Sequence, residues 1–191
     1  MTSYAFPELH QRPQAEPKTV YTVASGDLRL TTNLKTWAMQ QQVEAQFAAA
    51  VEDLGWSVHR AHGVDEAKGH GFIDNQRRGM DVFRDIPAEA PLVVVEAVWQ
   101  YSHHVLAGLR DHQGPILVVA NFAGDFPGLV GLLNLTGSMT KAGIAHGSIR
   151  KERKMPRPGR FWCTSSASPS PISSFSTSDT RTMTMVFQMA L

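Results

Sequence analysis

Short apolar runs alternate along the chain with longer segments in which apolar residues recur at helical spacing. The two clearest runs, at residues 92–95 and 116–120, are rich in Val and carry no charge. Uninterrupted apolar runs of this length are typical of strands buried on both faces, as in a parallel sheet. Together with weaker runs, they predict five strands, at about residues 20–24, 56–61, 92–95, 116–120 and from 144 onward.

Four segments between these runs predict helices, at about residues 36–54, 65–83, 101–112 and 128–141. Gly55 and Gly143 follow the first and the last of them as stop signals. Asp125 is well placed to cap the last helix, with Pro127 inside its first turn. The segment 65–83 is the weakest of the four, because a glycine inside a helix costs about 1 kcal/mol relative to alanine and this one contains three.

Regular alternation of strands and helices predicts an α/β fold with a doubly wound parallel sheet of about five strands, of the flavodoxin or Rossmann type. The sequence divides into a polar arm at 1–18, an α/β domain at 19–147 and a low-complexity tail at 148–191. The tail is rich in Ser, Thr and Pro and nearly lacks acidic residues. This composition indicates either a disordered segment or translation from a shifted reading frame, and we assign no function to it.

Composition narrows the class of protein. The chain has 191 residues and a net charge of +1, which indicates neither a nucleic-acid nor a membrane partner. Its N-terminus lacks the apolar core of a signal peptide, and no window has the uncharged apolar length of a membrane span. Cys163 is the single cysteine, which excludes an internal disulfide. We therefore expect a cytoplasmic protein.

Candidate site residues follow two of the predicted strands, where an α/β sheet usually places its ligands. They are Glu96, Trp99, Gln100 and His103 after residues 92–95, and Asn121, Gly124 and Asp125 after residues 116–120. The loop 121–128 precedes a helix, where free N–H groups favour an anion or a hydroxyl-rich ligand. It matches neither the dinucleotide-binding nor the P-loop pattern, and turn formation alone also explains its glycines.

Two of these positions have competing interpretations. A buried Glu96 would have a raised pKa suited to acid–base chemistry, although such a residue more commonly caps a helix or pairs with an arginine. His103 and His104 are adjacent, so on a helix they point about 100° apart and do not readily chelate one metal ion. The histidines of the chain show no metal-ligand spacing, so no metal site is expected here.

The segments PLVVVEAVWQYSHHVLAGL and GPILVVANFAGDFPGLVGLLNLTGSMTKAGIAH resemble the N-terminal region of the L-fucose/L-arabinose isomerase family. The resemblance covers about residues 19–147 and is strongest over 91–146. It implies an N-terminal α/β domain, which in the family precedes a second α/β domain and a β-rich domain. The family interconverts aldoses and ketoses with a divalent metal, usually Mn²⁺, whose ligands come from the later domains.

By this resemblance, the chain is a C-terminally truncated fragment that supplies part of a sugar pocket in a homo-oligomer and is inactive alone. Trp99 is similar to a tryptophan that lines the sugar site of fucose isomerases, and Arg29 to an arginine that reaches the sugar hydroxyls. A partly buried aromatic at the sheet edge and an ordinary exposed arginine are the alternatives. The expected substrate-binding residues are Trp99, Arg29, Gln100, His103 and Asn121, with no catalytic, cofactor-binding or metal-binding residue.

Two other classes of function remain open from the sequence. One is a non-catalytic sugar-binding or assembly module, since the doubly wound fold has many functions. The other is a small enzyme that uses Glu96, His103 and Asp125 directly. It ranks last, because no pair of residues here has a spacing specific to a nucleophile–base or metal mechanism.

Overall fold

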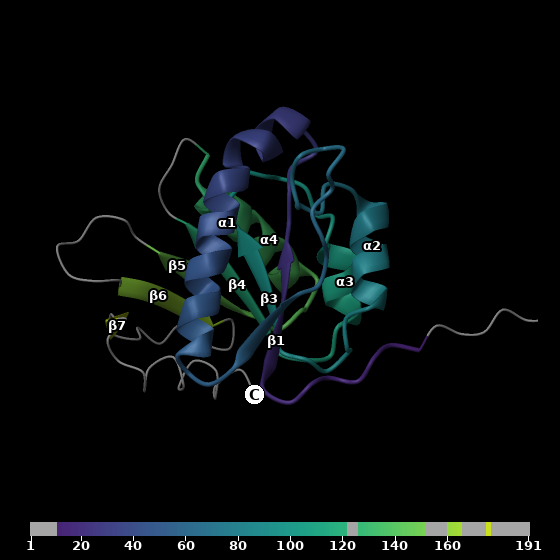
Figure 1. The fold of residues 1–191 in the computed structure, drawn as a ribbon, viewed down its shortest axis with the longest axis vertical. Coiled ribbons are helices and arrows are strands. Elements are labelled where there is room, and N and C mark those ends of the chain that lie inside the picture. Colours follow the sequence, from purple (N-terminus) through teal and green to yellow (C-terminus); the bar gives the residue numbers. More distant parts are fainter. Residues whose placement is uncertain (1–10, 122–125, 152–159, 166–174, 177–191) are drawn as a thin grey trace, which may run out of the picture.

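The computed structural model describes residues 11–121, 126–151, 160–165 and 175–176, with side chains described as far as Gly147. The predicted α/β class is confirmed: one sheet lies between helices (Figure 1). The strands are β1 (Thr19–Ala24), β2 (Ser57–Arg60), β3 (Leu92–Glu96), β4 (Ile116–Asn121), β5 (Gly147–Lys151), β6 (Arg160–Ser165) and β7 (Phe175–Ser176). The helices are α1 (Leu30–Glu52), α2 (Gln76–Arg84), α3 (Leu106–Asp111) and α4 (Gly128–Lys141).

The strand order is β2-β1-β3-β4-β5-β6-β7. Strands β1 to β5 pair in parallel, whereas β6 and β7 add antiparallel strands at one edge. From β1 the chain first adds β2 on one side and then β3 on the other. The carboxyl ends of β1 and β3 therefore flank a topological switch point, where open α/β sheets bind their ligands.

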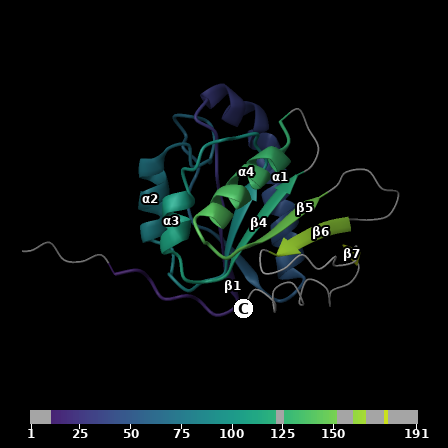
Figure 2. The ribbon, with the colours of Figure 1, turned by 180° about the vertical axis from the view of Figure 1, so that it is seen from behind.

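Apolar side chains on both faces of the sheet explain why the central strands are continuous apolar runs. Figure 1 shows α1 in front of the sheet, and α2, α3 and α4 cover the opposite face (Figure 2). Alternate residues of β3 pack on the two faces of the sheet. Val93 and Val95 belong to the cluster on the α1 side, with Phe47 and Val51. Leu92 and Val94 belong to the cluster on the other face, which contains residues of α2, α3 and α4. Every residue of β1, β3 and β4 is buried.

Helix boundaries differ from the sequence expectation in three places. Helix α1 begins at Leu30 rather than near residue 36, and α3 begins at Leu106 rather than near 101. Helix α2 covers only Gln76–Arg84, and Asn75 caps it through a 2.9 Å hydrogen bond from the Arg78 N–H. The preceding segment, expected to be helical from 65, instead contains Gly69 with a φ of 70° and pairs with the sheet.

The helix stops are as predicted, whereas the start of α4 is not. Gly55 and Gly143 have φ values of 76° and 71°, which favour glycine after a helix. Pro127 occupies the N-cap position of α4 rather than its first turn. The proposed cap Asp125, together with Gly124, lies outside the described residues. The fifth strand begins at Gly147 rather than 144, and β6 and β7 lie in the segment 148–191, where sequence periodicity predicts no strand.

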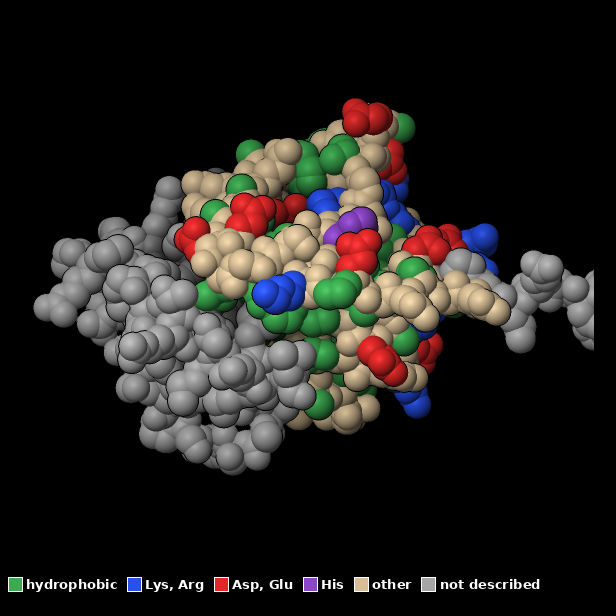
Figure 3. Space-filling model, turned by 60° about the horizontal axis from the view of Figure 1, so that its bottom comes forward, with side chains coloured by type: hydrophobic (Ala, Val, Ile, Leu, Met, Phe, Trp, Pro, Cys, Tyr) green, Lys and Arg blue, Asp and Glu red, His purple; other side chains and the backbone are tan. Residues whose placement is uncertain are grey.

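The end of the molecule that carries the amino ends of the strands is turned forward in Figure 3. Acidic, basic and hydrophobic side chains are interspersed there. Within the described part of the chain, no helix is both long and apolar enough to cross a bilayer.

Two helical glycines provide a test of the packing between α2 and α3. A Cβ at Gly108 of α3 would overlap the ring of Phe83, whereas a Cβ at Gly137 of α4 would meet no atom within 4 Å. We expect G108A to lower the free energy of unfolding by about 1–3 kcal/mol through overpacking. G137A should raise it by about 0.5–1 kcal/mol, because alanine is the better helix former. Urea denaturation of both variants measures the difference, and equal effects of the two substitutions would contradict this packing.

Candidate functional site

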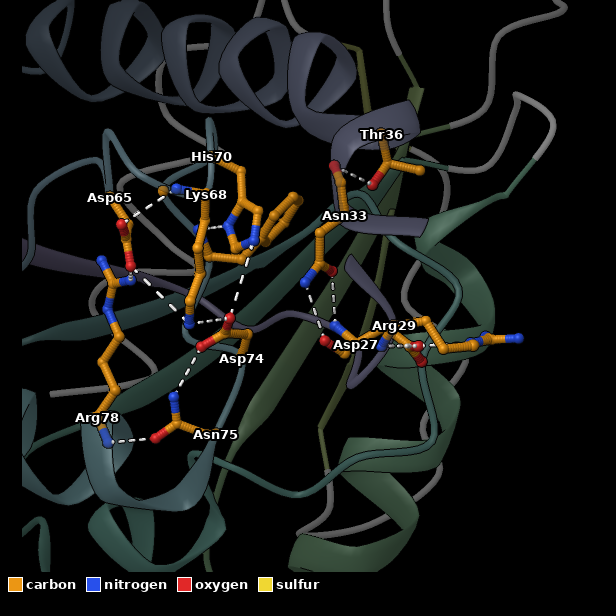
Figure 4. Close-up of polar contacts among 12 residues, drawn as sticks. Asp27, Arg29, Asn33, Thr36, Asp65, Lys68, His70, Asp74, Asn75 and Arg78 are labelled. Carbon is orange, nitrogen blue, oxygen red and sulfur yellow. Dashed lines mark hydrogen bonds and ion pairs between the residues drawn. The ribbon is translucent and has the colours of Figure 1, made fainter. Parts of the chain in front are cut away.

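The candidate site lies at the carboxyl ends of β1 and β3. The turn after β1 is fixed by α1: Asn33 Oδ1 accepts the Asp27 N–H at 2.8 Å, and Asn33 Nδ2 donates to the Asp27 carbonyl at 2.9 Å (Figure 4). Asp27 Oδ1 accepts from the N–H and the Nε of Arg29 at 2.9 and 2.7 Å. Asp27 is therefore buried, while the Arg29 side chain is 61% exposed beside the edge.

The segment after β2 lies alongside the end of β1. The Ala24 N–H donates to Nε2 of His62 at 3.0 Å, and the Gly26 N–H donates to the Ile73 carbonyl at 2.9 Å. Phe72 packs against this turn so closely that a Cβ at Gly26 would lie 2.5 Å from the Phe72 Cβ. Only glycine fits at this close approach, so the Ser25-Gly26-Asp27 turn is fixed from both sides.

Charged residues hold the rest of this segment in place. Lys68 Nζ lies 2.5 Å from Asp74 Oδ2 and 3.8 Å from Asp65 Oδ2, and His70 Nε2 lies 3.8 Å from Asp74 (Figure 4). Burial opposes ionisation of Asp74, but the hydrogen bond and the charge of Lys68 outweigh it and lower the pKa of that carboxyl. From α2, Arg78 also lies 3.5 Å from Asp65 Oδ2, so these contacts fix the loop beside β1.

A buried hydrogen-bonded chain connects β3 to β1. Gln100 Nε2 donates to Glu96 Oε1 at 2.7 Å and to Ser25 Oγ at 2.8 Å. All three side chains are buried, and Glu96 Oε2 and Gln100 Oε1 have no hydrogen-bond partner among the described residues. On the α1 side, Gln40 accepts the Ala97 N–H and donates to the Val95 carbonyl, so the backbone that leaves β3 is also fixed.

Aromatic side chains lie at the surface of the same edge. Trp99 is 36% exposed and Tyr101 is 60% exposed, and their ring centroids are 6.4 Å apart in an edge-on arrangement. Arg29 follows β1 at the same edge of the sheet, and its side chain is also exposed. We call these three exposed residues of the carboxyl edge the rim: Arg29, Trp99 and Tyr101.

The other predicted residues are less accessible. Asn121 is buried, and its Oδ1 accepts the Gly128 N–H at 3.0 Å at the start of α4. His103 is partly buried and its Nε2 lies 3.4 Å from Ser138 Oγ of α4. Gln100 is buried in the chain to Ser25. Trp99 and Arg29 are thus exposed at the same edge of the sheet, whereas Gln100, His103 and Asn121 make contacts within the fold.

Buried ionisable groups at this edge favour their neutral forms. Burial lowers the pKa of His62 to about 3, helped by the charges of Arg60 and Arg78. Burial likewise lowers the pKa of His70 and His104. Burial raises the pKa of Glu96 to about 8, against the opposing effect of its hydrogen bond from Gln100. At neutral pH the buried part of the edge therefore presents mostly uncharged donors and acceptors.

The side chains that are present do not fit a metal ion. No group of three or more His, Cys, Asp or Glu side chains in the described part of the chain is arranged to hold one. Among the described residues, Asp74 is the carboxylate within 4 Å of His70 Nε2, and Lys68 binds the same Asp74 oxygen. We accordingly derive no reaction step through a metal from these residues.

Sequence inspection missed several residues of the site. Tyr101 lies two positions after Trp99, so both aromatic residues belong to the connection between β3 and α3. Asp27 and Ser25 belong to the turn that follows the first predicted strand, 20–24, and were not among the candidates. His62 had no local signal, because its role depends on the distant Ala24 N–H.

No protein-family model, curated protein or solved structure matches the chain.

The lowered pKa of His62 predicts that the protein loses stability in mild acid. This pKa is about 3 in the folded protein and 6.5 ordinarily, so below pH 6.5 the unfolded chain takes up a proton that the folded protein does not. The free energy of unfolding should therefore fall by about 2 kcal/mol from this residue between about pH 6.5 and about pH 5. Denaturant unfolding at several pH values measures it. H62Q should flatten the slope, whereas the control H59Q, on an exposed residue of β2, should not; an equal slope in H62Q and the unsubstituted protein would contradict the assignment.

Proposed function

We propose that this α/β domain is the substrate-pocket domain of an aldose–ketose isomerase of the L-fucose/L-arabinose type, active in cytoplasmic carbohydrate metabolism. It binds the sugar at the carboxyl edge between β1 and β3. The metal, Mn²⁺ or another divalent ion, and the acid–base groups belong to other domains of the intact enzyme. The motif resemblance at residues 91–146 suggests this class, and the rim supports it.

The observation that carries the proposal is that Arg29, Trp99 and Tyr101 are all exposed beside the two strand ends that flank the switch point of the sheet. An exposed indole offers an apolar face for the C–H face of a sugar and an N–H for a hydroxyl. A guanidinium offers several donors in a planar fork, which suits neighbouring hydroxyls. The two side chains come from different strand–helix connections, so the fold and not local sequence brings them together.

The chemistry of the edge favours hydroxyls over phosphates as ligand groups. Arg29 is already paired with Asp27, which offsets its charge. The buried groups behind the rim, among them His70, His104 and Gln100, are neutral at neutral pH or carry no charge at any pH. A hydroxyl needs neutral donors and acceptors, whereas a phosphate needs uncompensated positive charge. This supports a neutral polyol such as a sugar.

Sugar binding by the purified chain tests the proposal. L-Fucose or L-arabinose should bind with a Kd on the order of 1 mM or weaker, because one domain supplies only part of the pocket. Saturation-transfer NMR detects such binding. W99A should weaken it about tenfold through loss of the stacking surface, and M80A, at an exposed residue of α2, is the matched control. Binding that is the same in W99A, or no binding of either sugar, would contradict the proposal, and turnover of sugar with Mn²⁺ would contradict the absence of catalytic groups.

A second candidate function is a non-catalytic module that binds sugar or assembles with a second copy of the chain. Exposed aliphatic side chains surround the same edge, which favours assembly there. They are Leu28, Leu30, Leu34 and Val64, and they come from the turn after β1, the first turns of α1 and the loop after β2. Clusters of exposed apolar side chains are typical of interaction surfaces.

Sedimentation analysis at several concentrations tests assembly through this surface. The unsubstituted chain should self-associate, and the double substitution L28S/L34S should shift it to monomer, because it removes the two most exposed of the aliphatic side chains. The control L133S replaces an equally exposed leucine on α4 and should not change association. Loss of association in L133S alone would place the interface elsewhere.

A further inference from the structure

Glu96 is buried where α4 meets the end of β3. Its side chain is 0% exposed, and its Oε2 has no hydrogen-bond partner among the described residues. A Cβ at Gly131 of α4 would lie only 2.6 Å from that oxygen and 2.8 Å from the Val98 carbonyl. The helix backbone therefore packs directly on the carboxyl group on the side of Oε2.

The loop that follows Glu96 carries Trp99 and is held by the same contact. Gln100 donates to Glu96 Oε1, and its backbone carbonyl accepts from Asn134 Nδ2 of α4 at 3.5 Å. A Cβ at Gly131 would also lie 3.1 Å from the Gln100 Cγ. Helix α4 thus packs against both the Glu96 carboxyl and the loop, and a movement that admits water to Oε2 from this side must separate them from α4.

We propose that Glu96 is the positioning residue of the loop 97–101, holding it against α4 while protonated, and that loss of the proton in mildly alkaline solution releases the loop and with it Trp99. An ionised carboxylate that has one buried oxygen without a hydrogen bond is strongly disfavoured, and a hydrogen bond from water lowers this free-energy cost. Since Gln100 already donates both of its amide hydrogens, it cannot supply a donor to Oε2, and water is needed for that oxygen.

No charged side chain among the described residues faces the carboxyl to set its ionisation. Gly131 of α4 and the Gln100 amide lie against it, Ala120 of β4 is its partner in the sheet, and Ser25, just after β1, binds the same Gln100 amide; none of these side chains titrates. On α1, Glu44 binds Gln40 and Arg60 rather than Glu96. Accordingly, the raised pKa of Glu96, about 8, comes from burial, opposed only by the Gln100 hydrogen bond. Ionisation therefore falls in an accessible range of pH.

The effect on ligand binding rests on the proposed function, whereas the ionisation and the loop movement do not. If Trp99 binds the sugar only when the loop is held, affinity follows the protonated fraction of Glu96. With a pKa of about 8, affinity should fall about tenfold between about pH 7 and about pH 9.

Fluorine NMR of the full chain labelled with 5-fluorotryptophan tests the proposal without any sugar. The chain has four tryptophans, and W99F assigns the Trp99 resonance. Between about pH 6 and about pH 10 this resonance should shift with a midpoint near 8. E96Q, which keeps a neutral side chain of the same shape, should abolish the shift. E52Q, at an exposed glutamate at the end of α1, is the matched control and should leave it unchanged.

A Trp99 resonance that does not titrate, or that titrates equally in E96Q, overturns the proposal. If E96Q does not fold, the carboxyl ¹³C resonance of Glu96 in the otherwise unsubstituted chain decides: a midpoint near 8 supports the proposal, and one near the ordinary value of 4.5 overturns it. A Trp99 shift without any sugar binding would support this role of Glu96 while contradicting the proposed function.

Discussion

The close approach of α4 to the end of β3 is the contact on which the candidate site depends. Gly128 and Gly131 allow it: a Cβ at Gly128 would overlap the Glu96 carbonyl, and one at Gly131 would press on the Glu96 carboxyl. Because α4 packs this closely, Glu96 is sealed from water and stays neutral. Glu96 and Ser25 then both accept hydrogen bonds from the Gln100 amide, and this bridge connects the two strand ends that flank the switch point.

The β1 side of the site depends on contacts from three different segments. Asn33 of α1 holds the Asp27 backbone, His62 accepts the Ala24 N–H, and Ile73 pairs with Ser25 and Gly26. Each contact satisfies a backbone group that the end of a strand would leave unpaired. Arg29 can therefore remain exposed while the turn that carries it is fixed, which is the arrangement that a binding residue requires.

Sequence patterning predicted the strands and the α/β class because strands buried on both faces leave continuous apolar runs, as at residues 92–95. It placed Trp99 at the carboxyl edge because strand ends follow from those runs, whereas Arg29 was singled out only through the family resemblance. It failed at residues 65–75, where the conformation depends on Lys68, Asp74 and the pairing of Ile73 with β1, none of which has a local period. Tertiary contacts of this kind override helix propensity. The sequence indicated that Glu96 could be buried, but its contact with the distant Gly131 of α4 depends on how the helix packs on the sheet.

The electrostatics of the edge limit the ligands it can take. Flavodoxin-like and dinucleotide-binding sheets bind phosphates with free N–H groups at a glycine-rich turn. Here the turn after β1 uses the Asp27 N–H and the Arg29 N–H internally, on Asn33 and Asp27. The same carboxylate of Asp27 pairs with the Arg29 guanidinium, so little positive charge remains at the switch point. With His70 and His104 kept neutral by burial, an anion would find few uncompensated partners, whereas a hydroxyl-rich neutral ligand would meet donors and acceptors beside an exposed indole.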